Sequence, residues 1–288
     1  MTDFNETVAA PDAANWEPMI ITVAPNGARR TKADHPALPM TPDELADTAA
    51  ACSRAGAAMI HLHVRDDDGG HSLDVGRYRD AISAIRDKVG DDMIIQVTSE
   101  AVGIYSTDQQ MAMVRELKPE AVSMAVREFV PDESANHEAA RFFRWLDQNR
   151  VMAQYILYSA DEVMRFADLR QRDIIPGDHV NVLYVLGRYQ KRENSDPRDV
   201  LPFLNVAGAD HCRWSICAFG PREGTAAVAA AALGGHVRVG FENNRWRFDG
   251  TLADDNSDLV KQAARAGNMI NRPLATARDA RMMMKGEV

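Results

Sequence analysis

The chain has 288 residues, of which 45% are hydrophobic and 26% are charged, and its formal net charge is −9. This composition is ordinary for a globular protein with a large core. The acidic balance argues against a nucleic-acid backbone as a partner, and no segment has the pattern of a basic membrane-binding helix. The longest apolar run, residues 226–233, is far too short to cross a bilayer. We therefore expect neither nucleic acid nor a membrane as a partner.

Residues 1–18 have the composition of a polar tail, and we expect one domain over residues 19–288 with a helical extension at its C-terminal end. The first residues include acids and lack a basic-then-apolar signal region. An odd number of cysteines without Cys-x-x-Cys spacing argues against a disulfide framework: Cys52, Cys212 and Cys217. Buried free thiols suit a reducing compartment, so the expected location is the cytoplasm.

Eight short apolar runs alternate with amphipathic segments after the tail. The runs predicted as strands are residues 19–24, 58–64, 93–98, 121–125, 152–157, 180–185, 213–218 and 237–240. The segments predicted as helices begin near Thr41 and cover residues 74–88, 107–117, 138–148, 159–170, 197–206, 223–233 and 257–271. Strand–helix alternation predicts a parallel α/β sheet, and eight repeats predict a closed (β/α)8 TIM barrel. An open doubly wound sheet is the alternative, but no Gly-x-Gly-x-x-Gly follows any strand.

Two histidines alternate along one of the apolar runs. Residues two apart in a strand point to the same face, so His61 and His63 project together, opposite an apolar face. Two imidazoles side by side on a rigid strand make half of a metal site. Polar residues follow at once, and a polar cluster at the carboxyl end of a strand is typical of a barrel active site. The alternative is two separately hydrogen-bonded core histidines, and the pattern favours the metal.

Catalytic groups of a TIM barrel lie at or just after the carboxyl ends of its strands. Those positions carry many polar side chains here: Asn26, Arg29, His61, His63, Thr98, Ser99, Glu100, Ser123, Arg127, Glu128, Arg188, Lys191, Arg192, Arg222, Arg238, Glu242, Asn243 and Asn244. Most of them, taken alone, are more simply explained as solvated loop residues. The prediction of an active site rests on their coincidence at one rim.

Glu242 is the candidate third metal ligand. The second and eighth strands are both even-numbered and can contribute to one layer of inward side chains. Glu242 has the parity of Arg238 if the last strand runs on. Two histidines and a glutamate with an open position form a catalytic zinc pattern. The alternative is an ion pair of Glu242 with Arg238 or Arg245. Three other histidines precede strands and belong to the opposite end, which weakens an amidohydrolase interpretation: His179, His211 and His236.

Several segments resemble the β-keto acid cleavage enzymes, of which the 3-keto-5-aminohexanoate cleavage enzyme is the best known. They are residues 21–28 (ITVAPNGA), 56–66 (GAAMIHLHVRD), 118–120 (KPE), 234–244 (GGHVRVGFENN) and 272–276 (RPLAT). The likeness covers about residues 19–276. The His-Leu-His and Gly-Phe-Glu motifs, in this order and at this separation, are specific.

The resemblance implies a zinc-dependent barrel, commonly a homotetramer, that converts a β-keto acid and acetyl-CoA into acetoacetate and a new acyl-CoA. Another divalent metal is an alternative to zinc. It implies that His61, His63 and Glu242 bind the metal and that Arg238 is catalytic. Thr98 falls where the family has a serine near the substrate. Further candidates for substrate binding are Asn26, Arg29, Ser99, Glu100 and Ser123, and loop cations for the phosphates of coenzyme A are Arg188, Lys191, Arg192 and Arg222.

The sequence departs from the family at the residues that handle the substrate. The family motif often reads Glu-Asp-Asn, and its Asp is thought to help remove the substrate proton, but Asn243 stands here. An amide cannot act as a carboxylate base. We therefore expect either that another group, Glu128 or Glu100, takes the proton or that the reaction differs. The segment around Ser123 also lacks the Asn and Thr of the family's loop.

Arg29 bears on the substrate. It occupies a position where enzymes for amino-bearing substrates place a glutamate, so the resemblance suggests a 3-oxo dicarboxylic acid. Glu100 and Glu128 would favour a cation instead.

Two other functions remain open. A metal-dependent hydrolase or aldolase on the same barrel would not use coenzyme A. A non-catalytic metal- or metabolite-binding barrel is the third interpretation, with Asn243 marking a lost base.

Overall fold

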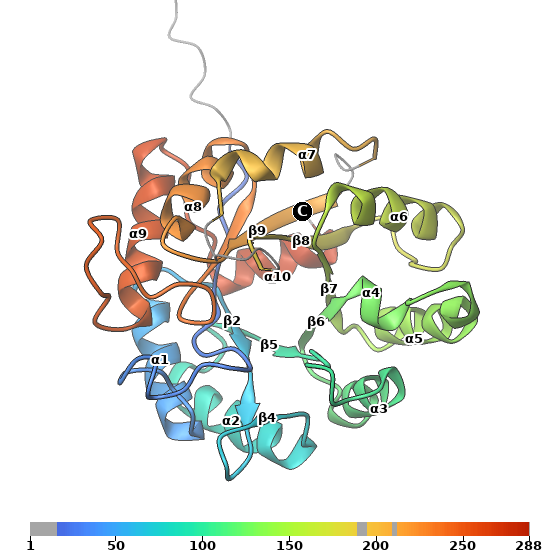
Figure 1. The fold of residues 1–288 in the computed structure, drawn as a ribbon, viewed down its shortest axis with the longest axis horizontal. Helices are drawn as coiled ribbons and strands as arrows, with labels where there is room; N and C mark the ends of the chain where they lie inside the picture. The colour runs from blue at the N-terminus through green and yellow to red at the C-terminus, as the bar shows by residue number, and fades with distance from the viewer. Residues whose placement is uncertain (1–15, 189–194, 209–211, 288) are drawn as a thin grey trace, which may run out of the picture.

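The computed structural model describes residues 16–188, 195–208 and 212–287. Eight parallel strands form a closed barrel in the order β1-β10-β9-β8-β7-β6-β5-β2 (Figure 1). The strands are β1 (Ile21–Val23), β2 (Met59–Leu62), β5 (Ile94–Thr98), β6 (Ala121–Ala125), β7 (Met152–Leu157), β8 (Val180–Leu186), β9 (Cys212–Ala218) and β10 (His236–Val239). The predicted (β/α)8 TIM barrel is confirmed, and strand ends differ from the predicted ones by at most two residues.

Helices surround the barrel (Figure 1). They are α1 (Pro42–Arg54), α2 (Val75–Val89), α3 (Thr107–Leu117), α4 (Val126–Phe129), α5 (Asn136–Gln148), α6 (Ala160–Gln171), α7 (Leu201–Leu204), α8 (Glu223–Ala232), α9 (Asn256–Met269) and α10 (Ala277–Lys285), with 3-10 turns η1 (Glu133–Ala135) and η2 (Pro197–Val200). The predicted helix over residues 197–206 is η2 followed by the short α7.

Side chains of the preceding residue begin most of the longer helices. The Thr41 hydroxyl accepts from the backbone N–H of Glu44, whose carboxylate accepts from the N–H of Thr41, and Pro42 fills the first helical position. Asp74, Ser106, Ser159 and Thr276 also cap the helices that follow them. The predicted start of α1 at Thr41 is therefore confirmed.

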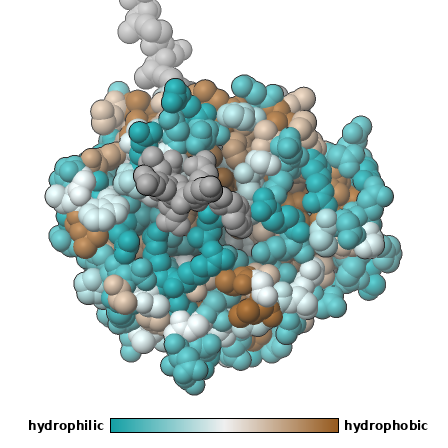
Figure 2. Space-filling view, viewed as in Figure 1, coloured by the Kyte–Doolittle hydropathy of each residue, from teal (hydrophilic) through white to brown (hydrophobic). Residues whose placement is uncertain are grey.

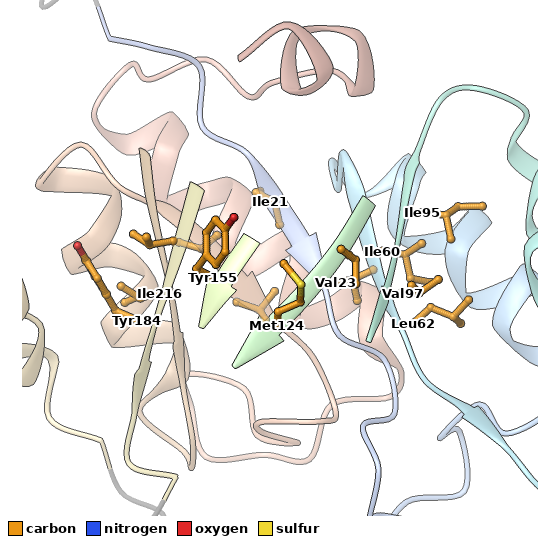
Figure 3. Close-up of a cluster of buried hydrophobic side chains, with 14 of the residues drawn as sticks. Ile21, Val23, Ile60, Leu62, Ile95, Val97, Met124, Tyr155, Tyr184 and Ile216 are labelled. Carbon is orange, nitrogen blue, oxygen red and sulfur yellow. The ribbon is translucent and has the colours of Figure 1, made fainter. Parts of the chain in front are cut away.

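The main core lies between the barrel and its helices. Outward strand residues such as Ile60, Leu62, Ile95 and Val97 are fully or almost fully buried there, as Figure 3 shows. Alternation along each strand turns the residues between them into the barrel. His61 therefore faces the interior because Ile60 and Leu62 are held in the outer core.

Helix α10 closes the amino-terminal end of the barrel. Met283 and Met284 pack with interior residues at the starts of the strands, among them Met59 and Ile94. An antiparallel hairpin, β3 (Val64–Arg65) with β4 (His71–Ser72), extends β2 at the opposite end. Neither α10 as a separate helix, nor the hairpin, nor α4 was predicted from the sequence.

The hydropathy of the surface and the contact of Glu17 near the start of the described chain are those expected of a globular protein. Figure 2 shows a face on which hydrophilic residues predominate and apolar patches are small. In the described part of the chain, no helix combines the length and apolar character needed to span a membrane. Most of the predicted tail lies outside the described residues, and Glu17 near its end binds Arg213 at 2.8 Å. The three cysteines are buried, as expected.

Candidate metal centre

The two histidines of the predicted site stand where β2 ends. His61 lies within β2 and His63 is the residue after its end, and both are buried. Their Nε2 atoms are 3.1 Å apart and their rings meet edge to face. The side-chain amide of Asn26 donates to the backbone carbonyl of His63 and to that of Pro39. This contact fixes the backbone at His63 against the loop after β1.

Glu242 reaches the histidines from a turn and not from a strand. β10 ends at Val239, and the N–H groups of Asn243 and Asn244 both donate to the Gly240 carbonyl. The condition for the predicted parity of Glu242 with Arg238, a last strand that runs on to residue 242, is therefore not met. Gly240 has φ of +139°, and a Cβ there would lie 2.4 Å from the Ala24 carbonyl oxygen. Only glycine suits this close approach, and the N–H of Glu242 then binds the same carbonyl at 3.0 Å.

A second glycine leaves room for the Glu242 side chain. Gly27 has φ of +63°, and a Cβ on it would lie 2.5 Å from Cγ of Glu242. The backbone of Gly27, in the loop after β1, therefore packs directly against the side-chain carbons of Glu242. This contact gives a physical reason for glycine in the segment 21–28.

The three side chains form a set that fits a metal ion. His61, His63 and Glu242 each offer one ligand atom, and these atoms all lie within 4.8 Å of one another. Oε2 of Glu242 is 3.5 Å from Nε2 of His63 and 3.7 Å from Nε2 of His61. Ligands of a tetrahedral zinc ion lie about 3.3 Å apart. Oε2 is buried without a hydrogen-bond partner among the described residues, which an ion at this point would explain.

Arg238 holds the other oxygen of the same carboxylate. Its Nη2 donates to Oε1 of Glu242 at 2.9 Å, so the ion pair and the metal geometry coexist. Burial opposes ionisation of Glu242, but the Arg238 charge and the His63 contact hold its pKa well below the usual range. Burial, with the Arg238 charge, lowers the pKa of His61 well below its usual value. A neutral imidazole and an ionised carboxylate are the forms that bind metal.

A chain of polar side chains crosses the barrel interior beneath His61. Nδ1 of His61 is 2.9 Å from Oε1 of Gln96, whose amide donates to Gln154, and Gln154 continues to Ser215 at 3.4 Å. An amide oxygen on Nδ1 places the proton there and leaves the Nε2 lone pair for a metal. Gln96 and Gln154 were not predicted from the sequence as site residues. Their signal was a glutamine at an inward position of an otherwise apolar strand.

A small pocket opens beside the cluster. Its described lining residues are His61, Thr98, Glu100, Ser123, Ala125, Ile156, Tyr158, Val185, Arg188, Phe219, Arg238 and Glu242, around an open volume of about 20 Å³. Seven of these were predicted from the sequence as site residues: His61, Thr98, Glu100, Ser123, Arg188, Arg238 and Glu242. The predicted rim residues from five different strands or loops therefore meet in one place.

Other predicted residues lie outside this lining. Asn26 and Ser99 are buried and bind backbone carbonyls, and Arg29 is exposed. Arg222 is exposed and pairs with Asp196 at 3.4 Å. Lys191 and Arg192 lie outside the described residues.

Glu128 and Asn243 face protein groups. Oε2 of Glu128 accepts from the amide of Gln110 at 2.6 Å and from the N–H of Ala101, and burial raises its pKa. The Asn243 amide donates to Glu223 at 3.3 Å and to the Arg238 carbonyl at 3.2 Å. Both residues therefore support loops that carry lining residues.

Glu223 is a buried residue that supports the site and was not predicted from the sequence. Its carboxyl group accepts from the N–H of Gly240 and from the amides of Asn243 and Asn244. Burial raises the pKa of Glu223 to about 8. Glu223 therefore holds in place the turn that carries Glu242. A glutamate at the start of α8 resembles an ordinary helix-terminus acid, so the sequence gives no signal for this role.

Comparison with known proteins identifies the family. A family model described as beta-keto acid cleavage enzyme matches residues 18–285. The chain belongs to the β-keto acid cleavage enzyme family. It is 32% identical to the 3-keto-5-aminohexanoate cleavage enzyme of Fusobacterium nucleatum, over 93% of this chain and 98% of that relative. It is 28% identical to the 3-oxoadipate:acetyl-CoA acetyltransferase of Cupriavidus necator, over 93% and 95%. The family resemblance predicted from the motifs is thus confirmed.

Solved structures of more distant proteins share the barrel. The apo structure of ObcA aligns with a TM-score of 0.68 at 16% identity, over 86% of this chain and 65% of that chain. This chain therefore spans slightly less than two thirds of the length of ObcA. The 3-dehydroquinate dehydratase of Geobacillus kaustophilus aligns with a TM-score of 0.56 at 12% identity, over 88% and 91%. These likenesses concern the fold alone.

Proposed function

We propose that this family member is a metal-dependent enzyme, with zinc as the expected metal, that converts a β-keto acid and acetyl-CoA into acetoacetate and a new acyl-CoA. The observation that carries the proposal is the convergence of His61, His63 and Glu242 beside a pocket in a chain of this family. The names of its relatives, which include an acetyl-CoA acetyltransferase, support the use of acetyl-CoA. A homotetramer and a cytoplasmic location stay predictions.

The proposed reaction begins with loss of a proton from the β-keto acid. The enolate carbon attacks the thioester carbonyl of acetyl-CoA, coenzyme A passes to the other acyl group, and carbon–carbon cleavage releases acetoacetate. A divalent ion held by His61, His63 and Glu242 would act as a Lewis acid that makes the enolate accessible. Arg238, buried at the pocket, would stabilise the negative charge that develops on the substrate.

The remaining roles follow from which groups line the pocket. Thr98 and Ser123 line the pocket, and their hydroxyl groups would bind substrate oxygens. Glu100 lines the pocket beside Arg188 and Glu128 does not line it, so geometry does not favour Glu128 as the group that accepts the substrate proton. Asn243 would act by holding the turn that carries Glu242.

The experiment incubates metal-loaded protein with a panel of β-keto acids, with and without acetyl-CoA, and measures acetoacetate and acyl-CoA by mass spectrometry. Both products are expected only when acetyl-CoA is present, and both should be lost in His61→Ala. His179→Ala is the matched control, because His179 is exposed and lies at the other end of the barrel. Turnover of the β-keto acid without acetyl-CoA would instead identify a hydrolase or aldolase. No turnover across the panel would overturn the proposal.

A further inference from the structure

The pocket at the metal centre has two different ends. His61 comes from β2, and Arg188 follows β8. In the closed ring, β8 is the fourth strand from β2 in either direction, through β5, β6 and β7 or through β1, β10 and β9. Arg188 therefore enters the pocket from the strand opposite the one that carries the first metal ligand. A substrate bound at the metal centre would point its far end toward Arg188.

The wall near Arg188 is apolar. Ile156, Val185 and Phe219 line the pocket and belong to one cluster on β7, β8 and the end of β9. Tyr158 packs on the same cluster and adds a phenol to this wall, which otherwise suits a short methylene chain. A positive charge for the substrate's far end must then come from Arg188, because Tyr158 is uncharged.

Arg188 is held in place, and its guanidinium group donates no hydrogen bond to another of the described residues. Its side chain is 14% exposed, and its guanidinium carbon lies 4.6 Å from the centroid of the Phe219 ring. Its carboxylate contact, with Oε1 of Glu100, is 3.6 Å long, which is beyond hydrogen-bond distance. A guanidinium carries five donors in a fork that matches a carboxylate. The Glu100 carboxylate thus marks where an incoming carboxylate would lie.

The charges of the lining favour a dianionic substrate. Arg188 and Arg238 offset Glu100 and Glu242, so a divalent ion would leave two positive charges in excess. A 3-oxo dicarboxylate supplies two negative charges and neutralises the site. An amino-bearing β-keto acid is a zwitterion, leaves the excess unchanged and puts its ammonium group near Arg188, which costs free energy in a confined pocket.

We propose that Arg188 binds the distal carboxylate of the substrate, so that this enzyme acts on 3-oxo dicarboxylic acids. The inference rests on the proposed function and assigns the substrate class of the same site. It moves the recognition of a distal carboxylate from the exposed Arg29 to Arg188, and it gives Arg188 a role other than the one with coenzyme A. The open volume of about 20 Å³ has room for roughly one water molecule. The substrate carboxylate therefore displaces Glu100, which is 24% exposed and can turn toward solvent.

The first test compares two substrates that differ only at the far end, 3-oxoadipate and 3-oxohexanoate, each with acetyl-CoA. Wild type is expected to favour the diacid in kcat/KM by at least about 10-fold. Arg188→Gln should lower kcat/KM for the diacid by about 10- to 100-fold, the effect of a lost hydrogen bond to a charged group. It should change the value for 3-oxohexanoate by no more than about 2-fold. Arg141→Gln, which removes an exposed arginine on α5, is the control and should leave both values unchanged.

The second test measures binding without turnover. Calorimetry with 3-hydroxyadipate and 3-hydroxyhexanoate, in the absence of acetyl-CoA, should show a loss of affinity in Arg188→Gln for the diacid alone. An equal loss for both compounds, or for both substrates, would overturn the assignment of Arg188. A wild-type preference for 3-oxohexanoate or for 3-keto-5-aminohexanoate would overturn it while leaving the proposed function intact. Absence of all turnover would overturn the proposed function, and the binding test would still decide the role of Arg188.

Discussion

Arg238 and Glu242 bind each other through one carboxylate oxygen while the other oxygen faces two imidazoles. The Arg238 guanidinium donates to Oε1 at 2.9 Å, and Oε2 lies 3.5 Å from His63 and 3.7 Å from His61. Both partners of the ion pair are almost entirely buried, with exposed side-chain fractions of 4% and 10%. One carboxylate is therefore oriented by a fixed cation and aimed at the site where a metal ion would lie.

Removing one partner of this buried pair should destabilise the metal-free protein. Arg238→Met leaves the Glu242 charge buried without its guanidinium, and we expect a loss of about 3–5 kcal/mol in the free energy of unfolding. The double variant Arg238→Met/Glu242→Gln should lose clearly less than the sum of the single losses, because no unpaired charge remains. Denaturant unfolding in the presence of a chelator gives the free energy of unfolding of wild type, both single variants and the double variant, which together form a double-mutant cycle. Additivity within about 0.5 kcal/mol would show that the pair is not coupled.

Gln96 should control metal affinity through the His61 ring. Gln96→Leu removes the acceptor from Nδ1 at 2.9 Å, so the proton is free to move to Nε2. We expect metal affinity to fall by about 10- to 100-fold, the usual effect of losing a partner that orients a ligand. Gln96→Glu keeps an acceptor and should retain affinity, and Gln154→Leu, one link further away, should have a smaller effect. Competition with a chromophoric chelator gives the affinities, and equal values for all variants would refute the role of Gln96.

Glu223 should make the stability of the protein depend on pH. Its pKa is about 8 when folded and 4.5 in the reference state, so between these values the folded protein holds a proton that the unfolded chain has lost. Stability from this group is complete below about pH 4.5 and is lost as pH rises toward 8. Glu223→Gln cannot ionise, so its stability relative to wild type should rise with pH, by up to about 1.4 kcal/mol per pH unit in this window. Unfolding curves from pH 5 to 9 measure the difference, which would be flat if the carboxyl group kept its ordinary pKa.

Two neighbouring methionines test the role of α10 as the closure of the barrel. Met283 is 1% exposed and packs against the starts of the strands, whereas Met282 is 36% exposed. Met283→Ala should cost about 2–5 kcal/mol in the free energy of unfolding. Met282→Ala, the control, should change it by no more than about 0.5 kcal/mol. Thermal or denaturant unfolding distinguishes the two, and similar losses would mean that the burial of Met283 does not stabilise the barrel.

The sequence predicted those features that depend on local periodicity. Eight apolar runs separated by amphipathic segments predict eight strands and their helices, because burial on the outer face repeats every second residue. The same period placed His61 and His63 on one face. Helix α10 was missed as a separate element although Thr276 and Asp279 form a capping box at its start. The turn glycines around residues 69 and 70 were a signal for the β3–β4 hairpin.

Features that depend on contacts between distant loops could not be predicted. Asn243 donates to Glu223, and Glu128 accepts from Gln110. No sequence pattern near Asn243 or Glu128 predicts these partners. Glu242 was identified from its strand parity with Arg238, and this reason does not hold because Glu242 lies in a turn after β10. Arg29 and Arg188 look alike in the sequence, and only the fold exposes the first and turns the second into the pocket.

Metal content is the most direct test of the central claim that His61, His63 and Glu242 bind one metal ion. Wild type and His179→Ala, dialysed at neutral pH after zinc is supplied, should each contain about one ion per chain by elemental analysis. His61→Ala, His63→Ala and Glu242→Gln should contain almost none while remaining folded by circular dichroism. A wild-type protein that retains no metal, or ligand variants that retain as much as wild type, would contradict the account.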